Sequence, residues 1–311
     1  MTSCSRAGRR EAFLTFGRDL STFAALMPEL LSICIPTFNR ASYLRDLLDT
    51  LIPELEQAPE AAGLVRLYIS DNASPDSTPQ VIETFSGRWP IIHNRNARNI
   101  GGDYNFAQMI DRATGDYFWL LGDDELMAGG FLTPLLERLK PKRDHLLILD
   151  GLGTTRAANL NPKNPATFPD YAALVAHYSR LDPWQLVEHT LISSLIIKRD
   201  VFDREANRKI LLTKDRNYAH MHGLAEGLIQ NPGPVHFHQV PTIHVREQRP
   251  PTEGVTYLKY RYLWGRYYKW LGRKFGHAEL TAYARVQFTW RTWIRLQHER
   301  LKYALGWPRE S

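Results

Sequence analysis

Three consecutive carboxylates leave an apolar run of the chain together. They are Asp123, Asp124 and Glu125. The run before them, Tyr117–Leu121, is aromatic and aliphatic and predicts a buried strand. Mutual repulsion and desolvation make such a cluster costly unless a cation neutralises it. Hard oxygen ligands of this kind suit Mg²⁺ or Mn²⁺, which also hold substrate phosphates, although a solvated acidic turn ending a strand gives the same short pattern.

Strands and helices alternate through the first half of the chain. The expected strands are Leu31–Pro36, Val65–Ser70, Trp89–His93, Tyr117–Leu121 and His145–Asp150. The expected helices are Ser42–Glu56, Thr78–Phe85, Asp103–Ala113 and Gly130–Leu139. This alternation predicts an α/β fold with a mostly parallel, Rossmann-like sheet flanked by helices. Such sheets bind ligands at the carboxyl ends of their strands, so polar residues there should face one crevice.

Three further segments place polar residues at those ends. Residues 36–40 follow the first strand, Asp71 and Asn72 follow the second, and residues 99–105 carry two adjacent glycines before the third helix. Hydroxyl and amide side chains can bind a nucleotide, helix N-terminal amides favour phosphate, and paired glycines let the backbone approach a ligand. Each segment alone is equally typical of a capped turn or an Asx turn.

In order, these four segments resemble the inverting glycosyltransferases of family 2, which have the GT-A fold. The sequence Leu120–Asp124 is most similar to the branch of O-antigen sugar transferases within this family. The resemblance covers residues 31–150 well and the remainder weakly. The matching stretches are Leu31–Arg40, Ile69–Ser74, Asn99–Asn105 and Leu120–Glu125.

The resemblance implies a role for each matching residue. The residues implied to bind the nucleotide and the donor sugar are Pro36, Thr37, Asn39, Arg40, Asp71, Asn72, Gly102, Asp103, Asn105 and Asp123. The implied ligands of Mn²⁺ or Mg²⁺ are Asp123, Asp124 and Glu125, and Asp124 is also implied in catalysis. Many family members have another acidic residue where this chain has Leu121, so we expect Glu125 to compensate.

Sugar transfer with inversion needs a general base for the acceptor hydroxyl. Family members usually supply an Asp or Glu at the start of a helix after the second buried segment. The corresponding text here is Tyr218–His222, so the resemblance puts His220 in this role, and imidazole titrates near neutral pH. A histidine that only caps or packs is the alternative, and Asp215 and Glu226 are the substitutes.

Three other histidines, His236, His238 and His244, lie in a segment that we expect to be extended. The His-x-His pair would place two rings on one face of a strand, and neutral imidazole is a common metal ligand. Because no matched carboxylates lie nearby in sequence, we favour a structural role for these histidines.

Bulk properties indicate a globular protein of a reducing compartment. The chain has 311 residues and two cysteines, Cys4 and Cys34, far apart in sequence, which argues against a disulfide scaffold. No apolar run reaches the roughly 18 residues of a membrane span, and we see no secretory signal. Met27 is a candidate natural start. We expect a cytoplasmic protein that is peripheral to the inner membrane face.

The last part of the chain is basic and aromatic. Residues 255–311 hold twelve Lys or Arg against three Glu, and five of the eight tryptophans. A helix over 281–303 would align aromatic residues with basic ones beside them, which fits an interfacial helix on anionic lipid. The same face would equally well pack on the catalytic domain. No nucleic-acid motif accompanies the charge, so we expect no nucleic-acid partner.

Together these patterns predict a metal-dependent inverting glycosyltransferase, which moves a sugar from a nucleotide donor to a glycan or lipid-linked acceptor. The alternatives are a sugar nucleotidyltransferase and a membrane-associated binding module with an inactive GT-A domain. The expected parts are an N-terminal extension (1–30), a nucleotide-sugar-binding half (31–150), an acceptor-binding half (151–250) and C-terminal helices (251–311).

Overall fold

The computed structural model describes residues 29–152, 165–181, 186, 191–213, 219–244, 253–287 and 294. Its strands are β1 (Leu31–Thr37), β2 (Val65–Asp71), β3 (Ile91–Arg95), β4 (Tyr117–Leu120), β5 (Leu126–Met127), β6 (Leu146–Leu152), β7 (Thr167–Phe168), β8 (Leu195–Lys198) and β9 (Val235–His244). Its helices are α2 (Ala41–Gln57), α3 (Ala61–Leu64), α4 (Thr78–Ser86), α5 (Gly102–Arg112), α6 (Leu132–Leu139), α7 (Tyr171–Leu181), α9 (Arg204–Leu211), α10 (Ala219–Gln230), α11 (Glu253–Phe275) and α12 (Ala278–Gln287), with a 3₁₀ turn, η2 (Ile192–Ser194).

One mixed sheet runs through the described part of the chain in the order β3-β2-β1-β4-β8-β6-β9-β5, with β7 beside β9. The pairs among β3, β2, β1 and β4 are all parallel. Strand β8 then enters antiparallel to both β4 and β6, and β6 pairs with β9 in parallel. The predicted α/β class with a mostly parallel sheet is confirmed.

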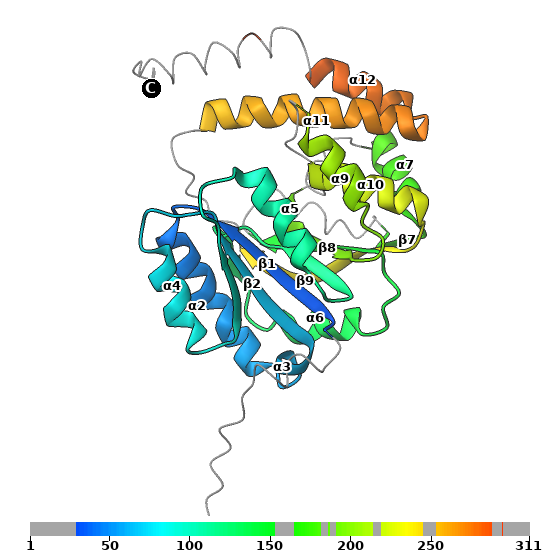
Figure 1. The fold of residues 1–311 in the computed structure, drawn as a ribbon. Coiled ribbons are helices and arrows are strands. Elements are labelled where there is room, and N and C mark those ends of the chain that lie inside the picture. The colour runs from blue at the N-terminus through cyan, green and yellow to red at the C-terminus, as the bar shows by residue number, and fades with distance from the viewer. Residues whose placement is uncertain are drawn as a thin grey trace, which may run out of the picture.

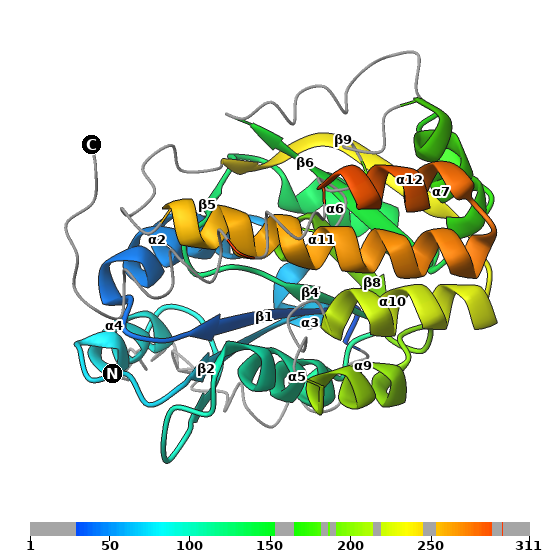
Figure 2. The ribbon, with the colours of Figure 1, turned by 90° about the horizontal axis from the view of Figure 1, so that it is seen from above.

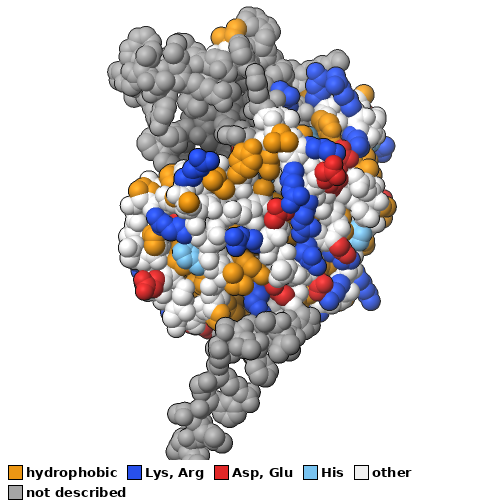
Figure 3. Space-filling view, in the orientation of Figure 1, with side chains coloured by type: hydrophobic (Ala, Val, Ile, Leu, Met, Phe, Trp, Pro, Cys, Tyr) orange, Lys and Arg blue, Asp and Glu red, His pale blue; other side chains and the backbone are white. Residues whose placement is uncertain are grey.

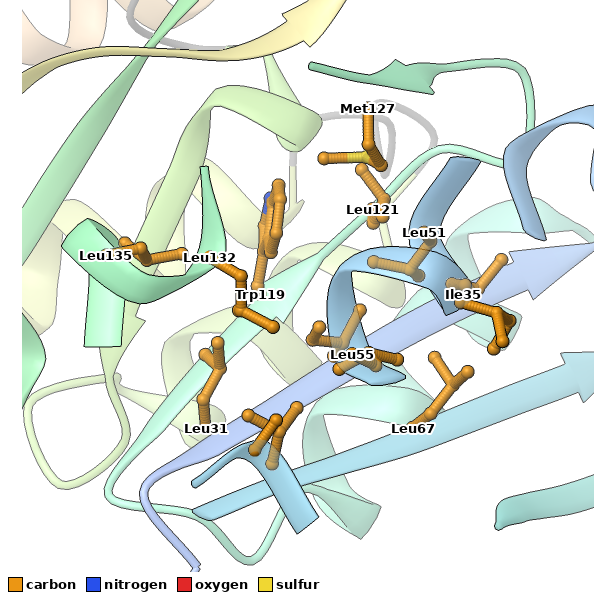
Figure 4. Packing of buried hydrophobic residues seen from close by; sticks show 14 of the residues in the cluster. Leu31, Ile35, Leu51, Leu55, Leu67, Trp119, Leu121, Met127, Leu132 and Leu135 are labelled. Atoms are coloured by element: carbon orange, nitrogen blue, oxygen red, sulfur yellow. The ribbon is translucent and has the colours of Figure 1, made fainter. Parts of the chain in front are cut away.

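The sheet is the middle of three layers (Figures 1 and 2). Leu31, Ile33 and Ile35 of β1 enter a core with helices α2, α4 and α6. Cys34 between them enters the opposite core with α5, α7 and α10. Because successive side chains of a strand point to opposite faces, burial on both faces explains why apolar residues follow one another in β1. Figure 4 shows the first of these cores around Trp119, which is fully buried.

The C-terminal region is helical, as predicted. Helices α11 and α12 lie against each other at one end of the molecule (Figure 1). Tyr267, Tyr268 and Leu271 of α11 are buried in the core that also holds α7 and α10. The aromatic face of α11 therefore packs on the rest of the fold through α7 and α10. Most of the predicted interfacial helix over 281–303 lies outside the described residues.

Several predicted boundaries move by one or two residues. The apolar run Leu191–Ile197, which is typical of one buried strand, forms the turn η2 followed by β8. The proposed boundary at residue 150 falls within β6, and one sheet holds strands from both sides of it. Cys34 is buried and unpaired with sulfur, whereas Cys4 and Asp215 lie outside the described residues.

Candidate active site

The acidic turn after β4 is joined to the loop after β1. Thr37 donates a hydrogen bond from Oγ1 to Asp123 Oδ2 at 2.7 Å. One guanidinium nitrogen of Arg40, Nη1, donates to Asp123 Oδ1 at 3.0 Å and to Asp124 Oδ2 at 2.9 Å. Strands β1 and β4 are parallel neighbours, so their carboxyl ends bring these residues to one edge of the sheet.

Burial and charge oppose each other at Asp123. The residue is only 5% exposed, and burial raises the pKa of its carboxyl to about 6, although Arg40 and Thr37 act to lower it. Asp124 is more open, with 47% of its side chain exposed. Burial lowers the pKa of Arg40, but the two aspartates outweigh it and the net direction is upward. Arg40 therefore places one positive charge between the two carboxylates of the turn.

The acidic turn is held from a distant part of the chain. Ser193 of η2 accepts a hydrogen bond at Oγ from the Gly122 amide at 3.0 Å, and its carbonyl accepts one from the Trp119 indole at 2.8 Å. A Cβ at Gly122 would lie 3.1 Å from both Asp124 Oδ1 and Ser193 Oγ, so a larger residue would crowd the turn. The sequence offered no signal for Ser193, because its partners are more than seventy residues away.

The carboxyl end of β2 carries a second buried carboxylate. Asp71 is fully buried; its Oδ1 accepts from the Ser74 amide at 2.8 Å, and its Oδ2 forms an ion pair with Arg95. Arg95 also donates to the Ser74 carbonyl at 2.9 Å. The sequence analysis missed Arg95, although its position at the carboxyl end of β3 is the same signal that singled out Asp71.

Five asparagines, Asn72, Asn94, Asn96, Asn99 and Asn105, form one connected network beside Asp71. Asn72 donates to Asn99 at 2.8 Å and accepts from Asn96 at 3.0 Å and from the Ile100 amide at 3.0 Å. Asn105, which is 2% exposed, accepts at Oδ1 from Ser70 and Asn96 and donates to the Ser70 carbonyl. These amides are used within the protein. Their geometry fixes the segment that leads into α5, where Gly102 and Asp103 lie in the first turn.

Two loops at this edge contain backbone in the left-handed region. Asn39 has φ of 55° and Ala73 has φ of 63°. The Asn39 amide donates to Ser74 Oγ at 2.9 Å, which links the two loops. Side chains other than glycine adopt this conformation at a cost, and such strain gathers at functional sites. The first free amide of α2, that of Ala41, is already satisfied by Asp76 at 2.9 Å.

His220 lies half-buried in the first turn of α10. After the last turn of this helix, the Asn231 carbonyl contacts the ring of His145, directly before β6, and the amide of His145 bonds to the Pro234 carbonyl. The amide of Lys198 bonds to the His145 carbonyl, and Lys198 pairs with Tyr117, the first residue of β4. His145 therefore lies at the edge of the sheet where β4 begins. The end of α10 therefore lies at the edge opposite the acidic turn. Figure 2 shows α10 extending beside the sheet. The first turn of α10, which contains His220, is therefore nearer than its last turn to the edge that carries the acidic turn.

The substitute bases and the other histidines have different surroundings. Glu226 forms an ion pair with Lys274 at 2.8 Å and lies about 9 Å further along α10 than His220. His236 bonds to Thr167 at 2.9 Å, and His238 is 5% exposed beside it, with burial lowering its pKa to about 4. These contacts suit structural residues.

The donor atoms at the acidic turn fit a divalent ion in part. Among the described residues, no group of three or more His, Cys, Asp and Glu side chains is arranged to hold a metal ion. Asp123 and Asp124 nevertheless direct one oxygen each at a single cationic nitrogen. Mg²⁺ and Mn²⁺ commonly use one or two carboxylates and complete their shell with water and substrate phosphates. The residues thus fit a metal that is shared with a phosphate ligand.

Comparison with known proteins gives a consistent result. The model of glycosyl transferase family 2 matches residues 32–204. Abequosyltransferase RfbV of Salmonella typhimurium is 38% identical over 118 residues, which cover 37% of this chain and 34% of the relative. An uncharacterized protein of Mycobacterium tuberculosis, Rv1520, is 33% identical over 97 residues, 30% of this chain and 27% of the relative. The alignments span a third or less of the relatives they match.

Solved structures share the fold. The mannosyltransferase PcManGT from Pyrobaculum calidifontis, in complex with GDP-Man and Mn²⁺, superposes with a TM-score of 0.56 at 13% identity, over 92% of this chain and 77% of that one. TarS of S. aureus (residues 1–349), in complex with UDP-GlcNAc, gives 0.54 at 11% identity, over 86% and 79%. At such identities the likeness establishes the GT-A fold.

Proposed function

Because the chain belongs to glycosyl transferase family 2, we propose that it is a metal-dependent, inverting glycosyltransferase that moves a sugar from a nucleotide donor to a hydroxyl of a glycan or lipid-linked acceptor. The observation that carries the proposal is the convergence of Asp123 and Asp124 with Thr37 and Arg40 at the carboxyl edge of the sheet. Family membership also favours glycosyl transfer over nucleotidyl transfer.

Each carboxyl end would contribute one part of the donor site. Asp71, held by Arg95 and the Ser74 amide, offers a buried acceptor to the nucleobase. Asp123, which is buried at the turn, would face the ribose, and the half-exposed carboxylate of Asp124 would bind the metal with Asp123 and Glu125. A bound Mn²⁺ or Mg²⁺ ion neutralises the charge that develops on the leaving diphosphate. The relatives support such a donor, because two solved neighbours hold a nucleotide sugar.

The asparagine network would orient the donor sugar indirectly. The side-chain amides of Asn72 and Asn105 are hydrogen-bonded to Asn96, Asn99 and Ser70. They therefore act by shaping the turn that begins α5, where Asp103 and the Gly102 amide would approach the sugar. This changes their role from ligands, as the resemblance implied, to residues that position ligands.

His220 would take the proton from the acceptor hydroxyl. A base must be within hydrogen-bonding reach of the proton that it accepts, and the first turn of α10 is nearer than its last turn to the edge that carries the donor site. Glu226 is a weaker candidate, since Lys274 neutralises it at the more distant part of the helix. Attack on the face opposite the diphosphate gives inversion at the anomeric carbon.

The acceptor would reach the site from a membrane surface. Among the described residues, no helix is long and apolar enough to cross a bilayer. Arg266 and Arg273 are exposed on α11, the helix that also carries the half-buried Trp264 and Trp270. Figure 3 shows basic and acidic side chains intermingled over the visible face. A surface of mainly basic side chains on the C-terminal helices would differ from this face and would attract anionic lipid. Stronger sedimentation with anionic than with zwitterionic vesicles would support this part of the proposal, and equal, negligible sedimentation would refute it.

The donor class is tested with nucleotide sugars directly. Purified protein is incubated with UDP-, GDP-, CDP- and dTDP-sugars and Mn²⁺, and release of the nucleoside diphosphate is followed with and without acceptor glycans. We expect turnover with one base class, loss on chelation of the metal, and inversion of the anomeric configuration by NMR. Absence of binding and of release for every donor would refute the proposal.

A further inference from the structure

Arg40 occupies the point at which a cation would neutralise both aspartates. A single nitrogen, Nη1, lies 3.0 Å from Asp123 Oδ1 and 2.9 Å from Asp124 Oδ2. We propose that Arg40 is an exchangeable counter-ion: it leaves the two aspartates when the diphosphate of the donor arrives, and a divalent ion takes the place that it leaves. This inference rests on the proposed function of the site.

The guanidinium is free to exchange. Its side chain is 40% exposed, and it lies at the junction between the loop after β1 and helix α2. Among the described residues, the other guanidinium nitrogens of Arg40 donate no hydrogen bond, and its remaining contact is the face of Tyr43, 5.5 Å from the ring centroid. These nitrogens can form a bidentate pair with phosphate oxygens, which is the geometry that a guanidinium favours.

Asp123, in contrast, stays in place. It is 5% exposed, and its second oxygen is held by Thr37 at 2.7 Å. The Ser193 hydroxyl holds the start of the turn through the Gly122 amide. Because this carboxylate is fixed and the guanidinium beside it is 40% exposed, the cation is the partner that can change.

Arg40 and a divalent ion exclude each other at this point. An ion held between the two aspartates would lie where Arg40 Nη1 now lies, and like charges so close repel strongly. The diphosphate of a nucleotide sugar brings two negative charges, which give Arg40 a new partner and offset the charge of the incoming ion. Arg40 therefore makes binding of the metal depend on binding of the nucleotide.

This coupling is measurable without any turnover. Mn²⁺ binding is measured by the EPR signal of the free ion, with the wild-type protein and with Arg40→Gln, first alone and then with UDP, GDP, CDP or dTDP. We expect Arg40→Gln to bind Mn²⁺ alone about tenfold more tightly than wild type, the low end for removing one nearby like charge. The nucleoside diphosphate should tighten Mn²⁺ binding about tenfold or more in wild type and much less in Arg40→Gln.

Three variants control the experiment. Arg45→Gln removes an equal charge from an exposed position of the same helix and should behave as wild type. Arg40→Lys keeps the charge and should retain weak binding of Mn²⁺ alone, and Asp124→Asn should weaken Mn²⁺ binding in every background. Thermal melting confirms that each variant folds.

The outcomes separate this inference from the proposed function. The exchange is overturned if wild type and Arg40→Gln bind Mn²⁺ alone with equal affinity, or if neither protein binds it. It is also overturned if Arg45→Gln changes the affinity for Mn²⁺ as much as Arg40→Gln does. If Mn²⁺ alone binds Arg40→Gln more tightly but no nucleotide binds to any variant, the exchange stands and the donor assignment fails.

Discussion

The two parts of the sheet are built differently. From β3 to β4 the strands are parallel neighbours, and the residues that follow them supply Asp71, Arg40 and the acidic turn. From β8 onward the sheet is mixed, and the parallel pairing of β6 with β9 is interrupted by shifts in register near Asp150. The first part contains donor-site residues that are close to strand ends in sequence. The second contains Ser193, which meets the acidic turn only through the fold, and His220, the proposed base.

This difference assigns separate tasks to the two parts. The carboxyl ends of parallel strands place several polar loops at one edge with little dependence on the rest of the chain. The second part supplies the candidate base and holds the turn after β4 from outside. Variants in the first part should therefore affect donor and metal binding, whereas variants in the second should affect the chemical step or stability.

The strongest test of this division is His220→Gln. Removal of a general base lowers kcat by about 10²–10⁴-fold, while the KM for the donor should change little. The pH–rate profile should also lose the limb that reports the base. Glu226→Gln is the control on the same helix and should keep most of the activity, because its carboxylate is paired with Lys274. The reverse pattern would transfer the role of base to Glu226.

The matching test in the first part is Asp124→Asn. Loss of a carboxylate at the metal and diphosphate should lower kcat/KM about a hundredfold or more, mostly through weaker binding of metal and donor. Asp49→Asn, an exposed position of α2, makes the same chemical change away from the site and should leave the kinetics unchanged. Wild-type kinetics for Asp124→Asn at low Mn²⁺ would remove the acidic turn from the mechanism.

The position of α10 itself depends on close backbone approach. A Cβ at Gly227 would lie 1.8 Å from the carbonyl oxygen of Val201, so a side chain there must push α10 away from the segment before α9. Gly227→Ala should lower the free energy of unfolding by about 3 kcal/mol, at the upper end for overpacking. Gly63→Ala, at a helical position with open space around it, should be neutral or stabilising. Urea titration of both variants measures the contrast, and equal stabilities would contradict it.

Sequence alone predicted the first part of the sheet nearly completely. Uninterrupted apolar strands with short polar loops left few alternatives, and Thr37, Arg40, Asp71 and Asp123 do lie at one edge. The sequence could not predict that the side-chain amides of Asn72 and Asn105 bond to other asparagines and to Ser70, because hydrogen-bond partners depend on loop conformation. The role of Ser193 could not be predicted from the sequence either, because η2 contacts the acidic turn only through the pairing of β8 with β4.

Acid should destabilise the second part selectively. Burial lowers the pKa of both His222 and His238 to about 4, and the ring of His222 packs 4.5 Å from that of Trp270. In the unfolded chain these imidazoles bind protons below about pH 6.5, so the stability present above that pH is lost as the pH falls toward 4. Each contributes a slope of up to about 1.4 kcal/mol per pH unit. Urea unfolding at pH 7.5, 6 and 5 should show the loss, and His222→Phe should reduce its slope; an unchanged slope would assign the acid sensitivity elsewhere.

The smallest expected effect concerns the contact that joins the two parts. In Ser193→Ala the half-buried Gly122 amide loses its acceptor, which costs about 1 kcal/mol if water does not replace the hydroxyl. Because the Trp119 indole bonds to the Ser193 backbone, that contact survives the substitution and the fold should persist. The looser turn should raise the Mn²⁺ requirement and the donor KM several-fold and leave the pH dependence of kcat unchanged. Ser194→Ala is the neighbouring control, at an equally buried serine of η2. If both variants shift stability alike and neither shifts the Mn²⁺ requirement, Ser193 supports the fold only, and the acidic turn is positioned by the first part of the sheet alone.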